Sequence, residues 1–154
     1  MGMTPQEIYG YVDRKLRDRW TMREKAEAAV RRAIEDANRS RSTIGGVPGG
    51  KGGRKSNPTQ KAALILAAAE KQRDDALKWE EVFRKLDTMF PEKSNEGFIA
   101  GLIYGNGMSQ QDVCRFCKIS RQTVRRRIDR YVNYAALVAA GYGLIPKSEK
   151  EEVL

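Results

Sequence analysis

Apolar residues recur at steps of three and four through the first forty residues, the spacing that places side chains on one face of an α-helix. Thr4, Pro5 and Glu7 suit the N-cap, the first helical position and the capping box of that helix. The N-terminal segment, residues 1–41, is therefore predicted to be one long basic amphipathic helix that ends near residues 38–39. Its apolar stripe is formed by Ile8, Tyr11, Val12, Leu16, Trp20, Ala26, Val30, Ala33, Ile34 and Ala37.

A stretch rich in Gly, Ser and basic residues follows at 42–57, which predicts a linker or an irregular loop. Gly45, Gly50 and Lys51 have the spacing that begins a phosphate-binding P-loop. Gly52, however, stands where that motif needs Ser or Thr, and no apolar strand precedes the stretch, so nucleotide binding is excluded. The basic side chains by which this linker could contact DNA phosphates are Lys51, Arg54 and Lys55.

A second long helix is predicted to begin at Pro58 and to end before Pro91, within a central segment of residues 58–93. Its apolar stripe is formed by Ile65, Leu66, Ala69, Ala76, Trp79, Val82, Phe83, Leu86 and Phe90. The apolar segment 97–104 predicts a short buried helix. No segment shows the strict alternation of a half-buried strand. The expected fold class is all-α, with long amphipathic helices joined by the Gly-rich loop.

Residues 94–141 carry the pattern of a C-terminal helix-turn-helix module, followed by a tail at 142–154. Ser109 suits the N-cap of a short first helix, and Ser120 suits the N-cap of a second helix after a tight turn. Apolar residues at steps of one, three and four on both helices predict that the two helices pack together. The expected core of the module is Val113, Cys114, Cys117, Ile119, Val124 and Ile128.

The formal net charge of +9 is concentrated in two parts of the chain. Residues 1–57 carry 13 basic and 7 acidic side chains, and residues 108–131 carry 7 basic and 2 acidic ones. The second block coincides with the helix-turn-helix pattern, which favours DNA as the binding partner. The second helix of such a module enters the major groove, so we expect the helix at 121–131 to read bases.

Polar side chains on this helix that turn away from Val124 and Ile128 are candidates for base contacts. Arginine pairs with guanine, and glutamine with adenine, through two hydrogen bonds. The expected base readers are Arg121, Gln122, Arg125 and Arg126. Asp129 is expected to face outward with them. The residues expected to contact phosphates, and so to position the module on the duplex, are Ser109, Lys118, Ser120, Arg127 and Arg130.

Cys114 and Cys117 are the only cysteines, and the chain has no histidine. A zinc site needs about four ligands, so neither a metal nor another cofactor is expected. Free cysteine is a small apolar residue that is often buried, which favours a packing role where the two helices meet. A redox pair is the alternative interpretation. Because histidine is absent, the commonest catalytic arrangements are excluded, and we expect no enzymatic activity.

Residues 109–129, SQQDVCRFCKISRQTVRRRID, resemble the helix-turn-helix of sigma-factor region four and of phage regulators built on it. The layout of a basic helix, a Gly-rich stretch, a long helix and a C-terminal helix-turn-helix is similar to that of phage late-gene transcriptional regulators of the RinA and ArpU type. Two positions depart from the pattern: Lys118 stands where glycine is common, and Arg127 where an apolar residue is often found. The resemblance implies a regulator of phage or prophage genes that binds a promoter and could touch RNA polymerase.

The leading hypothesis is therefore a transcriptional regulator that binds double-stranded DNA, with a homodimer as a further arrangement to consider. One alternative is a phage DNA-packaging subunit of the small-terminase type, although such subunits place the DNA module first. Another is a redox-sensing DNA-binding protein that uses Cys114 and Cys117. The first residues lack the apolar core of a signal peptide, and no membrane partner is expected. The expected location is the cytoplasm of a bacterial host cell, in association with the nucleoid.

Overall fold

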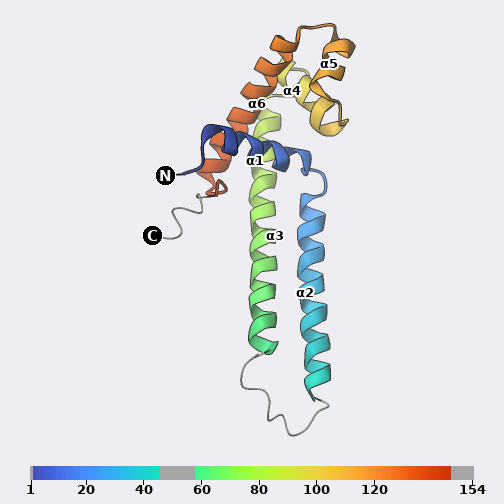
Figure 1. The fold of residues 1–154 in the computed structure, drawn as a ribbon, viewed down its shortest axis with the longest axis vertical. Helices are drawn as coiled ribbons and strands as arrows, with labels where there is room; N and C mark the ends of the chain where they lie inside the picture. The colour runs from blue at the N-terminus through green and yellow to red at the C-terminus, as the bar shows by residue number, and fades with distance from the viewer. Residues whose placement is uncertain (1, 46–57, 147–154) are drawn as a thin grey trace. The chain divides into compact units, whose positions relative to one another are not determined.

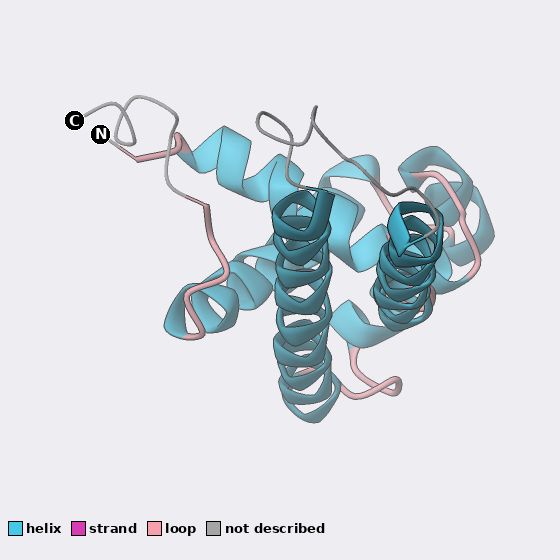
Figure 2. Cartoon of the chain, turned by 90° about the horizontal axis from the view of Figure 1, so that it is seen from below, coloured by secondary structure: helices cyan, strands magenta, loops and turns pink. Residues whose placement is uncertain are grey.

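The structure, a computed structural model, describes residues 2–45 and 58–146 (Figure 1). Every regular element within these residues is a helix (Figure 2), so the predicted all-α fold class is confirmed. None of these helices combines the length and the apolar character needed to cross a membrane. The elements are α1 (Pro5–Arg17), α2 (Met22–Gly45), α3 (Pro58–Met89), α4 (Asn95–Ala100), the π-helical turn η1 (Gly101–Gly105), α5 (Gln110–Cys117) and α6 (Arg121–Gly141).

The chain forms two compact units, and α3 contributes to both of them. The helix-turn-helix unit consists of residues 1–20 together with residues 78–154, and so contains α1, the C-terminal part of α3, α4, η1, α5 and α6. The hairpin unit consists of residues 21–77, and so contains α2 and the N-terminal part of α3. Each unit is described below by itself.

The single long helix predicted for the N-terminal segment is wrong, because α1 ends at Arg17 and α2 begins at Met22. The guanidinium of Arg19 donates a hydrogen bond to Asp87 on α3, with Nη1 and Oδ1 3.1 Å apart. Its carbon centre also lies 5.2 Å from the centroid of the Phe83 ring. These contacts between residues far apart in sequence favour the turn over a continuous helix. The predicted end near residue 39 is wrong as well, since α2 continues to Gly45.

The predicted linker at 42–57 therefore begins within α2, and its remaining residues, 46–57, lie outside the described residues. The same holds for residues 147–154 of the predicted C-terminal tail. The prediction for α3 agrees with the structure, since the helix starts at Pro58 and ends at Met89, two residues before Pro91. The short apolar segment at 97–104 is also helical, divided between α4 and η1.

The core of the helix-turn-helix unit is built around α6. Val12 and Leu16 of α1 are buried, and α1 packs against both α6 and η1. Trp79 of α3 is also buried; its ring centroid lies 6.2 Å from that of Tyr11 and 5.9 Å from that of Phe83. Aromatic pairs at this spacing stabilise a core beyond the area that they bury. The first helix of the chain is thus an integral part of this unit.

The hairpin unit has a small core of short side chains. Val30 and Ala33 of α2 pack with Ala69 of α3, and Ala29 and Leu66 lie partly buried against them. Larger apolar side chains remain outside this core, because Ile34 is 44% exposed, Ile65 50% and Leu64 67%. The burial of apolar area in this unit is therefore modest compared with that in the helix-turn-helix unit.

Gly97 allows α4 to lie directly against the end of α3. A Cβ atom at this position would overlap the backbone carbonyl oxygens of Pro91 and Phe90. The amide of Gly97 also donates a hydrogen bond to the hydroxyl of Ser94, the N-cap of α4, at 3.0 Å. Absence of a side chain at residue 97 is thus what permits this close approach.

We expect Gly97→Ala to lower the free energy of unfolding by about 1–3 kcal/mol, because backbone atoms have to move to accept the methyl group. Gly101→Ala is the matched control, since a Cβ atom there meets nothing within 4 Å. Urea denaturation of both variants measures the difference. Equal stability of the two variants would contradict the overlap at residue 97.

Candidate nucleic-acid interface

Two capped helices, α5 and α6, form the helix-turn-helix. The hydroxyl of Ser109 accepts a hydrogen bond from the amide of Asp112 at 3.1 Å, and the Asp112 carboxylate accepts one from the amide of Ser109 at 3.4 Å. This reciprocal pair is a capping box, which fixes the start of α5. The hydroxyl of Ser120 accepts a hydrogen bond from the amide of Thr123 at 3.1 Å and caps α6 in the same way.

The turn between the two helices has the geometry that glycine usually supplies. Lys118 has φ 56° and ψ 44°, in the left-handed region, and is the only non-glycine residue with positive φ among the described residues. The amide of Ile119 donates a hydrogen bond to the carbonyl of Cys114 at 3.3 Å, which closes the end of α5. Lys118 thus adopts the left-handed conformation itself, which strains the lysine backbone.

We expect Lys118→Gly to raise the free energy of unfolding by about 0.5–1 kcal/mol relative to Lys118→Ala. The left-handed conformation costs a residue with a Cβ atom about 1–2 kcal/mol, and the greater chain entropy of unfolded glycine offsets part of that gain. Both variants remove the same positive charge, so the comparison isolates the backbone effect. Thermal denaturation followed by circular dichroism measures it, and a less stable glycine variant would contradict the strain.

The residues expected to form the core of the module differ in their burial. Val113, Val124 and Ile128 are fully buried. Cys114 and Cys117 are half-buried on α5 and are not joined by a disulfide, and Ile119 in the turn is half-buried too. The described part of the chain contains no group of three or more potential metal-binding side chains.

The buried side of α6 is formed by Val124, Ile128, Tyr131, Val132, Ala135 and Ala139. At 100° per residue, Gln122, Arg126 and Asn133 lie on the opposite side of the helix, and all three are exposed. We call these three residues the outer face of α6. Arg121 and Arg125 are exposed as well, but they lie on the flank of the helix next to α1.

A shallow groove of about 860 Å³ runs along this flank. It brings Arg121, Gln122 and Arg125, three of the four predicted base readers, together with Gln6 of α1 and Gln110 of α5. The fourth, Arg126, lines a neighbouring groove that also contains Gln122 and Arg125. The four predicted base readers therefore line two adjoining grooves, which share Gln122 and Arg125.

Asn133 is a member of the outer face that the sequence interpretation missed, because it considered α6 only as far as residue 131. The helix continues to Gly141, so Asn133 faces the same way as Arg126, which lies two turns earlier. Asparagine can pair with adenine through two hydrogen bonds, as glutamine can. The signal available in the sequence was the lack of any Gly or Pro between residues 131 and 140.

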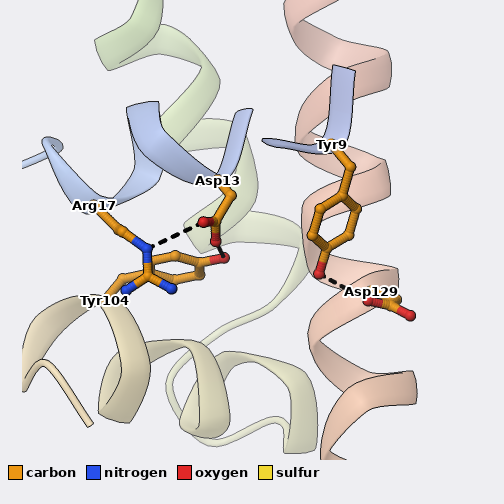
Figure 3. Close-up of polar contacts among 5 residues, drawn as sticks. All are labelled: Tyr9, Asp13, Arg17, Tyr104 and Asp129. Atoms are coloured by element: carbon orange, nitrogen blue, oxygen red, sulfur yellow. Dashed lines mark hydrogen bonds and ion pairs between the residues drawn. The ribbon is translucent and has the colours of Figure 1, made fainter. Parts of the chain in front are cut away.

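Asp129 is half-buried and lines both grooves with the predicted base readers, where Tyr9 of α1 binds it. The hydroxyl of Tyr9 donates a hydrogen bond to Oδ1 of Asp129 at 2.7 Å (Figure 3). Partial burial raises the pKa of Tyr9 above its usual value, and the hydrogen bond to Asp129 raises it further. Tyr9 therefore remains a protonated donor, and it holds the one acidic side chain of this part of α6 against α1.

A second contact fixes α1 on η1. The hydroxyl of Tyr104 donates a hydrogen bond to Oδ1 of Asp13 at 2.7 Å, and Oδ2 of Asp13 accepts one from Nε of Arg17 at 3.1 Å (Figure 3). The Arg17 guanidinium also lies over the Tyr104 ring, 5.5 Å from its centroid. Burial is the largest cause that raises the pKa of Tyr104, and the hydrogen bond to Asp13 is the second. Two tyrosine–aspartate contacts thus hold α1 beside the surface that carries the base readers.

The predicted phosphate contacts lie in different surroundings. Ser109 and Ser120 are exposed, but their hydroxyls already serve as helix caps. Lys118 is exposed at the turn, whereas Arg127 is half-buried. Arg130 forms an ion pair with Glu96 of α4, with Nη1 and Oε1 3.2 Å apart.

The carboxylate of Asp112 lies at the amino end of α5, where free amide groups could otherwise donate hydrogen bonds to a phosphate. It already accepts a hydrogen bond there and carries a negative charge that repels a phosphate. Lys118 is therefore the predicted phosphate contact whose surroundings best suit that role.

One family of known proteins is similar to part of this unit. The model of the homeodomain-like domain matches residues 99–138, which run from the end of α4 through η1 and α5 into α6. No curated protein and no solved structure matches the chain. The two capped helices, the tight turn and this match together identify residues 99–138 as similar to a homeodomain-like helix-turn-helix, a fold that binds DNA.

Proposed function

We propose that this protein is a sequence-specific regulator of transcription that reads the major groove of double-stranded DNA with α6. The observation that carries the proposal is the outer face, where Gln122, Arg126 and Asn133 are exposed on a helix of a homeodomain-like module. Gln122 and Asn133 can each donate one hydrogen bond to a base and accept another, and Arg126 can donate two. Arg121 and Arg125 extend this surface along the flank beside α1.

The resemblance of residues 109–129 to phage regulators supports a finer proposal. In this proposal the protein acts on phage or prophage genes, at the nucleoid of a bacterial host cell, and contacts RNA polymerase at a promoter. The chemistry of the site requires only binding, and no catalytic step is part of this function. In this proposal Cys114 and Cys117 have a packing role on the half-buried side of α5.

A titration of the full chain with DNA at several salt concentrations tests the proposal. Selection of bound sequences from a random duplex library first supplies the preferred site. We expect the logarithm of the association constant for that site to fall linearly with the logarithm of the salt concentration, by about 0.9 for each phosphate contact. Failure to enrich any sequence, or equal affinity for selected and scrambled duplexes, would contradict sequence-specific reading.

We further propose that the protein binds DNA as a homodimer. A single recognition helix reads few base pairs, and two copies would read two half-sites. Ile34, Leu64 and Ile65 of the hairpin unit are exposed and apolar, which supports association through that unit. Light scattering of the free protein and of its DNA complex measures the mass, and a monomer in both states would contradict a dimer.

A further inference from the structure

A hollow of about 470 Å³ opens in the helix-turn-helix unit, and Phe90 is the one residue that it shares with the grooves lined by the predicted base readers. The turn after α1, the end of α3, the segment α4–η1 and Tyr131 of α6 line it. Tyr131 belongs to the buried side of α6, so the hollow lies behind the helix rather than on its outer face. A volume of this size accommodates a small organic molecule.

Aromatic rings form much of the lining. Phe90, Tyr104 and Tyr131 lie close together, with the Tyr131 ring centroid 5.6 Å from that of Phe90 and 6.2 Å from that of Tyr104. Trp20 completes the lining near the opening, where it is 69% exposed. An exposed tryptophan beside three partly or fully buried rings provides aromatic faces for a planar ligand or a cation.

Glycines leave one wall of the hollow without side chains. Gly101 and Gly105 of η1 line it, and a Cβ atom added at either residue would meet nothing within 4 Å. Close packing therefore does not explain glycine at these two positions, in contrast to Gly97. The wall is also a π-helical turn, an irregularity that is frequent at functional sites.

The charged groups of the hollow favour a cation over an anion. The carboxylates of Asp87 and Glu92 both line it, and the one guanidinium, that of Arg19, is hydrogen-bonded to Asp87. The carbon centre of Arg19 lies 4.6 Å from the centroid of the Trp20 ring. Arg19 therefore neutralises Asp87 and lies over one face of the Trp20 ring, and the carboxylate of Glu92 gives the charged lining residues a net negative charge.

We propose that this hollow is a binding site for a small aromatic ammonium compound. Its ring would enter among Phe90, Tyr104 and Tyr131, against the glycine wall, and its ammonium group would lie near Trp20 and Glu92. Ammonium groups bind to aromatic faces because the ring faces carry negative potential, and a carboxylate adds to that attraction. The site goes beyond the proposed regulation of transcription and does not depend on it.

Benzyltrimethylammonium is the probe, and 2-methyl-1-phenyl-2-propanol is a neutral compound of the same shape. Titration of the full chain, followed by tryptophan fluorescence and by the amide NMR signals of residues 97–105, measures both affinities. We expect saturable binding of the cation, at least fivefold tighter than binding of the neutral compound. Equal affinity for the two compounds, or NMR changes confined to other residues, would overturn the proposal.

Two variants test the walls of the site separately. Gly101→Met fills the hollow and is expected to weaken binding of the cation at least tenfold, whereas Gly141→Met, at another open helical position, is the matched control. Glu92→Gln removes one exposed carboxylate without filling space. We expect it to weaken binding of the cation about threefold and to leave binding of the neutral compound unchanged. If both Gly101→Met and Glu92→Gln bind the cation with unchanged affinity, the proposal is overturned, even where the wild-type protein binds the probe.

Discussion

Replacement of Arg126 by alanine is expected to weaken binding to the preferred DNA site by about 1–3 kcal/mol and to relax the preference at one base position. Arg126 is exposed at the centre of the outer face, opposite the buried Val124 and Ile128. An arginine in this place can donate two hydrogen bonds to O6 and N7 of one guanine. Fluorescence anisotropy with the selected duplex, and with duplexes changed at one position each, measures both effects.

Arg84→Ala is the control for the loss of one positive charge. Arg84 is exposed on α3 in the same unit and pairs with Glu81, with Nη1 and Oε1 2.7 Å apart. We expect this variant to change the affinity for all duplexes little and equally. If Arg126→Ala weakens every duplex to the same extent, Arg126 contacts a phosphate and the assignment of the outer face is wrong.

Leu16→Ala is expected to lower the free energy of unfolding by about 2–5 kcal/mol, the range for a leucine removed from a packed core. Leu16 is only 1% exposed, and α1 packs against α6 and η1. Because this helix-turn-helix unit includes α1, the loss of stability should weaken DNA binding at temperatures near the midpoint of unfolding. Chemical denaturation followed by circular dichroism, together with DNA titration at two temperatures, measures these effects.

Ile34→Ala is the matched control in the hairpin unit. The Ile34 side chain is 44% exposed, so its truncation removes less buried area and leaves no enclosed cavity. We expect it to cost about 1 kcal/mol or less. If Leu16→Ala and Ile34→Ala destabilise the protein equally, α1 is not part of the core that supports α6.

These predictions follow from a helix-turn-helix unit that is larger than the part that resembles known domains. The homeodomain-like match covers residues 99–138, whereas α1 and the end of α3 also contribute buried side chains to the unit. The Tyr9–Asp129 contact joins α1 directly to the helix proposed to read bases. Residues 99–138 alone would lose these contacts and expose the apolar surface that α1 covers.

Local features of the fold could be predicted from the sequence because they depend on neighbours within four residues. The caps at Ser109 and Ser120 and the buried face of Val124 and Ile128 follow from residue type and helical spacing. The stop of α3 before Pro91 has the same local origin. The left-handed turn at Lys118 could be expected from the motif, although lysine itself does not favour it.

Only the tertiary structure decided which residues hold the turn after α1 and which side chain binds Asp129. The apolar spacing continues through residues 18–21 without a Gly or Pro, which led to the prediction of one helix, although Thr21 and Glu24 have the spacing of a capping box at the start of α2. The contacts involved join residues far apart in sequence, Arg19 with Asp87 and Tyr9 with Asp129. The sequence by itself determined the helices from α3 onward, the caps of α5 and α6, and the exposed basic side chains of α6. Packing of α1 decided what surrounds Arg121, Arg125 and Asp129 on the flank of α6, because periodicity describes one helix and not its neighbours.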